Sequence, residues 1–443
     1  MDIPFNLVER QCDNFPATLL PNNAIRAMTS AVIITLCVLL LLAYVFDITS
    51  ARTRIPSVIL LLMLGWVVRE LTLLFNIAIP DLSPVLPVLG TVGLILIVLE
   101  GSLELELNKS RIPLIIKSFL GALVPLMVLS FLMAFALQHF TGASLKNSVT
   151  CAIPLAVIGS SIAISSVRNL SPLNREFVVY ESSLSDILGV LFFNFVALNE
   201  SITTVTYGKF GLQLAGMVLL SLACVLGLSF LLSRVRHHVM FAPIILFVIL
   251  IYAISKEYQL PALVFILILG LFLGNIDVLR RFRWVERLRP GKLNKEVGRF
   301  KEITYEATFL IRSLFFLLFG YLISTKDLLN LESLAWSVVI VSVIYLVRLI
   351  QLILSRLPLV PLLFIAPRGL ITILLFLAII PEQSIPLVNE SLILQVIVLT
   401  ALIMMIGLLM GEKKQGVPAA AEVPDPAEVT WSSSHEQDVA DGD

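Results

Sequence analysis

The hexapeptide Glu181-Ser182-Ser183-Leu184-Ser185-Asp186 places two acids and three serines inside an otherwise apolar run from residue 177 to 198. Such a run is long enough to cross the hydrocarbon core of a bilayer, which takes about 20 helical residues. A carboxylate at that depth costs about 2.5–3.5 kcal/mol, so acids there are expected to have a function. Glu181 and Asp186 lie on different faces of the predicted helix. We therefore predict that Asp186 carries an ion and that Glu181 is a structural counter-charge.

The composition indicates a polytopic α-helical membrane protein. Of 443 residues, 58% are hydrophobic and 14% are charged, whereas soluble domains have about 25% charged residues. The apolar residues fall into about thirteen blocks of membrane-spanning length. The expected spans are 25–46, 55–75, 83–103, 112–138, 147–168, 176–199, 209–233, 239–255, 260–276, 302–323, 334–356, 360–381 and 389–411.

The loops predict the orientation of the chain. Lys and Arg concentrate in alternate loops, above all in 280–301, which places those loops in the cytoplasm. Residues 1–24 are then an extracytoplasmic segment, residues 25–411 form the transmembrane domain, and residues 412–443 form a disordered cytoplasmic tail. We expect no cofactor and no nucleic-acid partner.

Two segments indicate an internal repeat of opposite orientation. Residues 55–65 and 260–270 both have Pro and Gly nine residues apart. They belong to the second and the ninth expected spans, seven apart in the order, so they run in opposite directions. Three spans after each lies a helix interrupted by Gly or Pro, in 147–168 and in 360–381. Paired broken helices are typical of secondary transporters with inverted repeats and a site near the bilayer midplane. The repeat halves would be residues 25–199 and 239–411, linked by the helix 209–233.

The charges within the spans predict the site. Arg368 follows the Pro that breaks one helix, and we predict that it pairs with Glu181. Asp186 is then the free carboxylate, able to hold either a proton or a small cation. Ser182, Ser160 and Ser161 would supply further oxygens to that cation. The alternative is that Asp186 is a hydrogen-bonded packing residue.

Four other charges remain secondary candidates. Glu100 precedes a glycine near the inner end of its span and could line an entry funnel. Glu306 and Arg312 are six residues apart, too far for a pair within one helical turn, so Arg312 is expected to bond backbone carbonyls. Arg348 is expected to be a snorkelling or packing residue.

Four motifs resemble the cation:proton antiporter superfamily, on its branch of NhaP-type and NHE-type sodium/proton exchangers. The segments 99–105, 181–186, 315–320 and 366–370 are similar to the family's E-G-G-L-E-L, E-S-x-x-N-D, F-F-x-x-x-G and P-R-G-L patterns. The resemblance implies the NhaA-like antiporter fold, with two broken crossing helices and alternating access. It also implies a homodimer in a cell membrane, most simply a bacterial inner membrane, and a transporter rather than an enzyme.

Two departures from the family pattern bear on function. Ser185 replaces the usual Asn before the aspartate, and Gly159-Ser160-Ser161 stands where the family has T-D-P. One titrating acid favours electroneutral exchange of H⁺ for Na⁺, with K⁺ or Li⁺ as other cations. The alternative function is a membrane binding or regulatory protein that keeps the scaffold without transport.

Overall fold

The computed structural model describes residues 22–53, 55–76, 82–105, 111–167, 170–199, 204–234, 241–257, 262–275 and 290–411. Within these ranges every regular element is helical. The elements are α1 (Asn22–Thr53), α2 (Ser57–Leu74), α3 (Val85–Glu104), α4 (Ile112–Thr141), α5 (Leu145–Ala156), α6 (Ser160–Ser166), α7 (Pro172–Leu198), α8 (Thr204–Arg234), α9 (Phe241–Glu257), α10 (Ala262–Gly274), α13 (Pro290–Leu322), α14 (Thr325–Leu328), α15 (Leu331–Leu354), η2 (Leu362–Phe364), α16 (Leu370–Leu377), η3 (Pro381–Gln383) and α17 (Glu390–Gly411).

The helices confirm a polytopic membrane protein. Each expected span falls on one of these helices or on a pair separated by a break. In the described part of the chain, seven helices are long and apolar enough to cross a membrane. The expected extracytoplasmic segment up to residue 21, the 280–289 part of the basic loop and the tail after residue 411 lie outside the described residues.

Local signals in the sequence set several helix ends. Helix α4 ends where Gly142 takes the left-handed conformation, with φ +68°, which suits glycine because it has no side chain. Ser144 then begins α5, and its hydroxyl accepts the Asn147 backbone N–H. Asn330 caps α15 in the same way, through the N–H groups of the next turn. These caps explain how short loops turn the chain back into the bundle.

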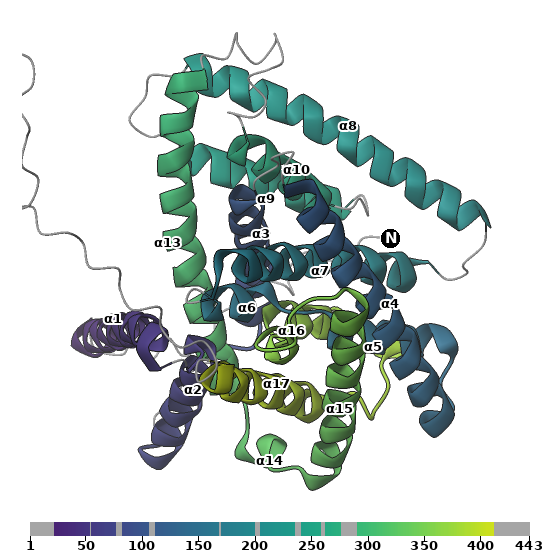
Figure 1. The fold of residues 1–443 in the computed structure, drawn as a ribbon. Helices are drawn as coiled ribbons and strands as arrows, with labels where there is room; N and C mark the ends of the chain where they lie inside the picture. The colour runs from purple at the N-terminus through teal and green to yellow at the C-terminus, as the bar shows by residue number, and fades with distance from the viewer. Residues whose placement is uncertain are drawn as a thin grey trace, which may run out of the picture.

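Two short helices occupy the centre of the bundle. Figure 1 shows α6 and α16 in the middle of the molecule, among α3, α4, α5, α7, α15 and α17, whereas α1 and α8 lie at its edge. Helix α5 stops at Ala156, and α6 begins at Ser160 after an extended segment. Residues 365–369 are likewise unwound before α16 begins. Both breaks occur at the Gly and Pro positions that the sequence predicts.

Helix contacts match the expected inverted repeat. The Gly65 of α2 lies against the backbone of α13, and the Gly320 of α13 lies reciprocally against α2. In the other half, the Gly270 of α10 lies against α3. The second expected span, α2, therefore packs on the tenth, α13, and the ninth, α10, packs on the third, α3. In the expected repeat the second span corresponds to the ninth and the third to the tenth, so these two contacts are equivalent, as two repeats of opposite orientation require.

The α2–α13 contact should be sensitive to a single methyl group. A Cβ added at Gly65 would lie 2.8 Å from the Tyr321 nitrogen and still closer to a backbone oxygen of α13. Gly65→Ala should therefore lower the free energy of unfolding by about 1–3 kcal/mol through overpacking. The measurement is thermal unfolding of the detergent-purified protein.

The matched control is Gly216→Ala on α8, where a Cβ would meet nothing within 4 Å. Its unfolding temperature should equal or exceed that of the wild type, because alanine favours helix over glycine. Equal effects of the two substitutions would contradict the close packing of α2 on α13.

Candidate functional site

The two breaks meet and bond to each other. The Gly159 N–H donates to the Pro367 carbonyl over 2.9 Å. A Cβ added at Gly159 would lie only 2.8 Å from the Gly369 nitrogen, so the two backbones touch at this point. Unwound backbone inside a membrane protein requires such internal partners. The crossing of α5–α6 with the segment before α16 is therefore the structural centre of the site.

Asp186 lies on α7 beside this crossing and is 3% exposed. Its Oδ2 accepts hydrogen bonds from the Ser160 hydroxyl and, over 3.3 Å, from the Ser160 backbone N–H. Its Oδ1 has no hydrogen-bond partner among the described residues. The structure thus brings Asp186 and Ser160 together, as predicted, and leaves one carboxylate oxygen available.

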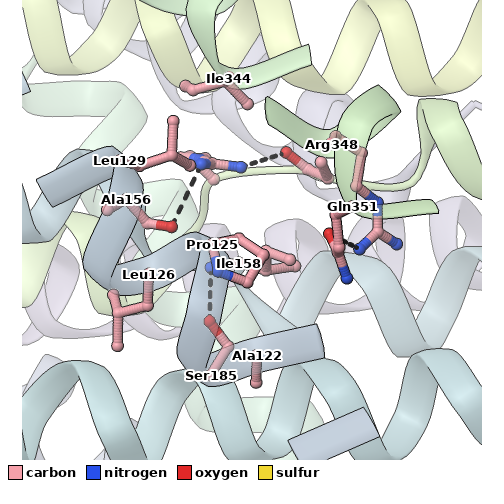
Figure 2. A pocket seen from close by; sticks show the side chains of 12 residues that line it. Ala122, Pro125, Leu126, Leu129, Ala156, Ile158, Ser185, Ile344, Arg348 and Gln351 are labelled. Atoms are coloured by element: carbon pink, nitrogen blue, oxygen red, sulfur yellow. Dashed lines mark hydrogen bonds between the residues drawn. The ribbon is translucent and has the colours of Figure 1, made fainter. Parts of the chain in front are cut away.

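Ser185 fixes the unwound segment from the other side. Its hydroxyl accepts the Ile158 N–H over 3.0 Å, which satisfies one donor of the break after α5. Figure 2 shows this bond at a small cavity that Arg348 and Arg368 also line. The cavity has about 10 Å³ of room for the centre of a water molecule, close to the minimum for one water. Ser185 therefore positions the backbone of the crossing.

Glu181 pairs with Arg348, so the predicted Glu181–Arg368 pair is wrong. Arg348 Nη2 donates to Glu181 Oε2 over 2.8 Å, and Nη1 donates to Oε1. Gln351 Nε2 adds a bond to Glu181 Oε1 over 2.6 Å. Glu181 and Arg348 are 1% and 2% exposed, so Arg348 is not a snorkelling residue. The pair joins α7 to α15 and neutralises both charges.

Arg368 instead binds backbone carbonyls. Its guanidinium donates to Leu155 O over 2.8 Å, to Ala156 O over 3.2 Å and to Ala366 O over 2.8 Å. The first two carbonyls end α5, where the break removes their helical partners. The end of a helix also carries partial negative charge that favours a cation. Arg368 therefore needs no carboxylate, which is the physical reason that it does not pair with Glu181.

The remaining predicted residues lie in different environments. The Ser182 hydroxyl donates to Val178 O over 2.7 Å, within its own helix. Ser161 is buried, and its hydroxyl has no partner among the described residues. Glu100 is half-buried near the C-terminal end of α3. The structure does not bring Glu306, which is exposed on α13, or the half-buried Arg312 into hydrogen-bond contact with Asp186.

Sequence reasoning missed Arg348 and Gln351 as partners of Glu181. The available signal was their spacing of three on a span that otherwise has few polar residues, since such residues share a helix face. It also missed Thr400 of α17, whose hydroxyl accepts the Arg368 backbone N–H over 3.1 Å. Nothing in the sequence around Thr400 distinguishes it from other hydroxyls in the spans.

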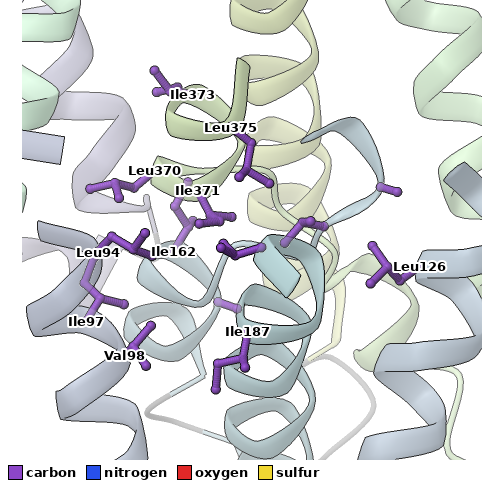
Figure 3. Close-up of a cluster of buried hydrophobic side chains, with 14 of the residues drawn as sticks. Leu94, Ile97, Val98, Leu126, Ile162, Ile187, Leu370, Ile371, Ile373 and Leu375 are labelled. Carbon is purple, nitrogen blue, oxygen red and sulfur yellow. The ribbon is translucent and has the colours of Figure 1, made fainter. Parts of the chain in front are cut away.

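Apolar side chains enclose the crossing. Leu94, Ile97 and Val98 of α3 approach Ile162 of α6 and Leu370 of α16 (Figure 3). All five are buried. Their packing excludes water, which lowers the local dielectric and strengthens electrostatic interactions at the crossing. Asp186 is thus a buried carboxylate with no cationic side chain bound to it among the described residues.

Paired broken helices that cross beside a buried carboxylate define a secondary transporter. A family model described as "Sodium/hydrogen exchanger, transmembrane" matches residues 37–411. The chain therefore belongs to the sodium/hydrogen exchanger family, which is a family of transporters. Membership supports Na⁺/H⁺ antiport as its function.

Solved structures share the fold. One is the sodium proton antiporter MjNhaP1 from Methanocaldococcus jannaschii at pH 8, which matches with a TM-score of 0.63 and 17% identity over 87% of this chain and 96% of its own. A second, electron-microscopy structure of MjNhaP1 matches with a TM-score of 0.61 and 17% identity over 86% of this chain and 94% of its own. A search of curated proteins found no match.

Breaking the Glu181–Arg348 pair should strongly destabilise the fold. Glu181→Ala leaves Arg348 buried without a carboxylate, so the free energy of unfolding should fall by about 3–5 kcal/mol. Replacing both partners, Glu181→Gln with Arg348→Met, should recover most of that loss because no unpaired charge remains. Thermal unfolding in detergent measures both effects.

Arg111→Ala is the control, because Arg111 pairs with Glu176 at side-chain exposures of 38% and 30%. An exposed pair contributes about 0–1 kcal/mol, so this change should be small. If Arg111→Ala destabilised the protein as much as Glu181→Ala, the buried pair would have no special role.

Proposed function

We propose that this chain is a monovalent cation/proton antiporter that exchanges Na⁺ for H⁺, with Asp186 binding the two ions in turn. The observation that carries the proposal is the state of the Asp186 carboxylate. Ser160 bonds one oxygen, and the other has no partner among the described residues although the side chain is buried. Such a group can bind a proton or a hard cation, and either one displaces the other. That competition is sufficient for exchange.

The other charges support this role by being satisfied elsewhere. Arg348 neutralises Glu181, and backbone carbonyls hold Arg368. Asp186 is then the titrating group of the site. One carboxylate that carries either H⁺ or Na⁺ moves no net charge in a full cycle, so we propose electroneutral, one-for-one exchange. Oxygen ligands also accept other small monovalent cations, so K⁺ and Li⁺ remain candidates.

Alternating access would expose Asp186 first to one side of the membrane and then to the other. The crossing suits this motion because its bonds connect two helices that belong to opposite repeats. Alternating access in such folds is largely the rigid motion of one bundle against another around a fixed site. We propose that Glu181–Arg348 keeps the moving bundle intact by joining α7 to α15.

We further propose the orientation with the amino terminus outside and the carboxyl terminus in the cytoplasm. Basic residues at the starts of α4 and α7, Arg111 and Arg175, support it. On the family resemblance we also propose a homodimer in a cell membrane, most simply a bacterial inner membrane. Exposed apolar side chains on α1 and α8, including Leu41 and Leu212, offer surface for lipid or for a second copy.

A binding or regulatory protein without transport is the less favoured function. This alternative is considered because the first broken helix has Gly159-Ser160-Ser161 where the family's T-D-P pattern has an acid. Ser160 nevertheless directs both its hydroxyl and its N–H at Asp186, so the altered break still provides polar contacts to the carboxylate. The same transport assay distinguishes the two functions.

Asp186→Asn should abolish Na⁺-driven proton movement, because an amide neither titrates nor balances a cation's charge. The measurement is the collapse of a pH gradient in proteoliposomes after addition of Na⁺, Li⁺ or K⁺, followed by a pH-sensitive dye. Clamping the membrane potential should not change the wild-type rate if the exchange is electroneutral.

Glu176→Gln, at a half-buried position near the start of the same helix, is the matched control and should retain transport. Persistent exchange in Asp186→Asn would refute the proposed carrier. No exchange in the wild type with any of the three cations would favour the regulatory alternative.

A further inference from the structure

Two basic side chains lie at one end of the contact between α4 and α15. Lys117 of α4 and Arg356, which follows α15, are both exposed. Neither side chain forms a hydrogen bond or an ion pair with another described residue. Glu176, near the start of α7, pairs with Arg111 instead. No described acid therefore neutralises these two charges.

A hydrogen bond between α4 and α15 sets the level of the two basic residues. Gln351 Nε2 of α15 donates to Gly121 O of α4 over 3.0 Å. That carbonyl has no helical donor, because Pro125 lies four residues later and lacks an N–H. Lys117 lies four residues before Gly121 on the same face of α4, and Arg356 lies five residues after Gln351.

The directions of the two helices bring these residues to the same end of the bundle. Helices α4 and α15 are the fourth and the eleventh expected spans, seven apart in the order, so they run in opposite directions. Residues before Gly121 and residues after Gln351 therefore lie on the same side of the Gln351–Gly121 bond. This is the end where α4 begins and α15 ends.

Arg356 has a backbone conformation that an arginine rarely adopts. Its φ is 51°, in the left-handed region. The Leu357 N–H donates to Leu352 O and the Arg356 N–H donates to Ile353 O, a helix ending in which this position is usually glycine. The other described non-glycine residue with positive φ is Asn76, a residue type that tolerates it. A strained residue of this kind points to a use for its side chain.

The surface around the two basic residues is apolar. In a membrane protein such a surface faces acyl chains, and long basic side chains extend from it to the headgroup level. In the proposed orientation this end of the bundle faces the cytoplasm, where anionic lipids attract basic residues. The exposed apolar side chains nearest in sequence are Ile116, Leu120, Ile353, Leu354 and Leu359.

We propose that Lys117 and Arg356 bind the headgroup of an anionic phospholipid, whose acyl chains pack on the apolar side chains of α4 and α15. The headgroup phosphate supplies the acceptors that both side chains lack, and the fork of a guanidinium matches a phosphate. Figure 1 shows α4 and α15 on the opposite side of the molecule from α1. The lipid site is therefore separate from the apolar surface of α1, and it does not depend on ion exchange at Asp186.

Thermal unfolding of the detergent-purified protein tests the site. Added dioleoyl-phosphatidylglycerol should raise the unfolding temperature, because a ligand of the folded state stabilises it. Dioleoyl-phosphatidylcholine, which has the same chains and no net charge, should raise it less. Lys117→Gln should increase the phosphatidylglycerol concentration for half-maximal stabilisation about fivefold, the fold-change for the attraction of one basic residue. Lys117→Gln with Arg356→Gly should increase it about 25-fold.

Arg356→Gly separates lipid binding from damage to the fold. Glycine accepts a positive φ without a steric cost, so the lipid-free variant should unfold at the wild-type temperature or above it. Lys209→Gln is the matched control, because Lys209 is exposed near the start of α8, and it should keep the wild-type response. The inference is overturned if phosphatidylcholine stabilises the wild type as much as phosphatidylglycerol does. It is equally overturned if the double variant keeps the wild-type response, or if Lys209→Gln loses as much of it.

Discussion

Arg368 makes the crossing of the two broken helices possible. Ending α5 at mid-depth leaves carbonyls without helical partners, and in a bilayer no water replaces them. The guanidinium donates to two carbonyls at the end of α5 and to Ala366 O in its own unwound segment. One side chain therefore connects both breaks, and the Gly159–Pro367 hydrogen bond completes the connection.

This use of Arg368 determines what the other charges do. Because its guanidinium is taken by carbonyls, Glu181 must find its counter-charge elsewhere, and Arg348 of α15 supplies it. The described core then holds one neutralised acid, one arginine balanced by backbone dipoles, and Asp186. Asp186 is the acid that remains open to exchange. We propose that Asp186 can bind a proton or a cation because Glu181 and Arg348 neutralise each other and backbone carbonyls hold Arg368.

The sequence predicted the parts of the site that depend on local pattern. Spans, breaks, and the acids and serines near the crossing follow from apolar blocks and from Gly and Pro positions. Partner choice did not follow, since it depends on which helices pack side by side. Arg348 and Arg368 are both buried arginines. Only the packing of α4 against both α15 and α7 brings Arg348 to Glu181. The serines of α7 also show what the sequence could not predict. The helical period places both Ser182 and Ser183 near Asp186, but only the structure shows that the Ser182 hydroxyl donates to Val178 O and that the Ser183 hydroxyl has no partner among the described residues.

The central claim is that a proton and Na⁺ compete for the Asp186 carboxylate. The most direct measurement is proton release when Na⁺ is added to the purified protein in weakly buffered solution. Binding of a metal ion to a protonated ligand releases its proton, so the account predicts acidification that saturates with Na⁺ and is absent in Asp186→Asn. Na⁺ binding without proton release, or undiminished release in Asp186→Asn, would contradict it.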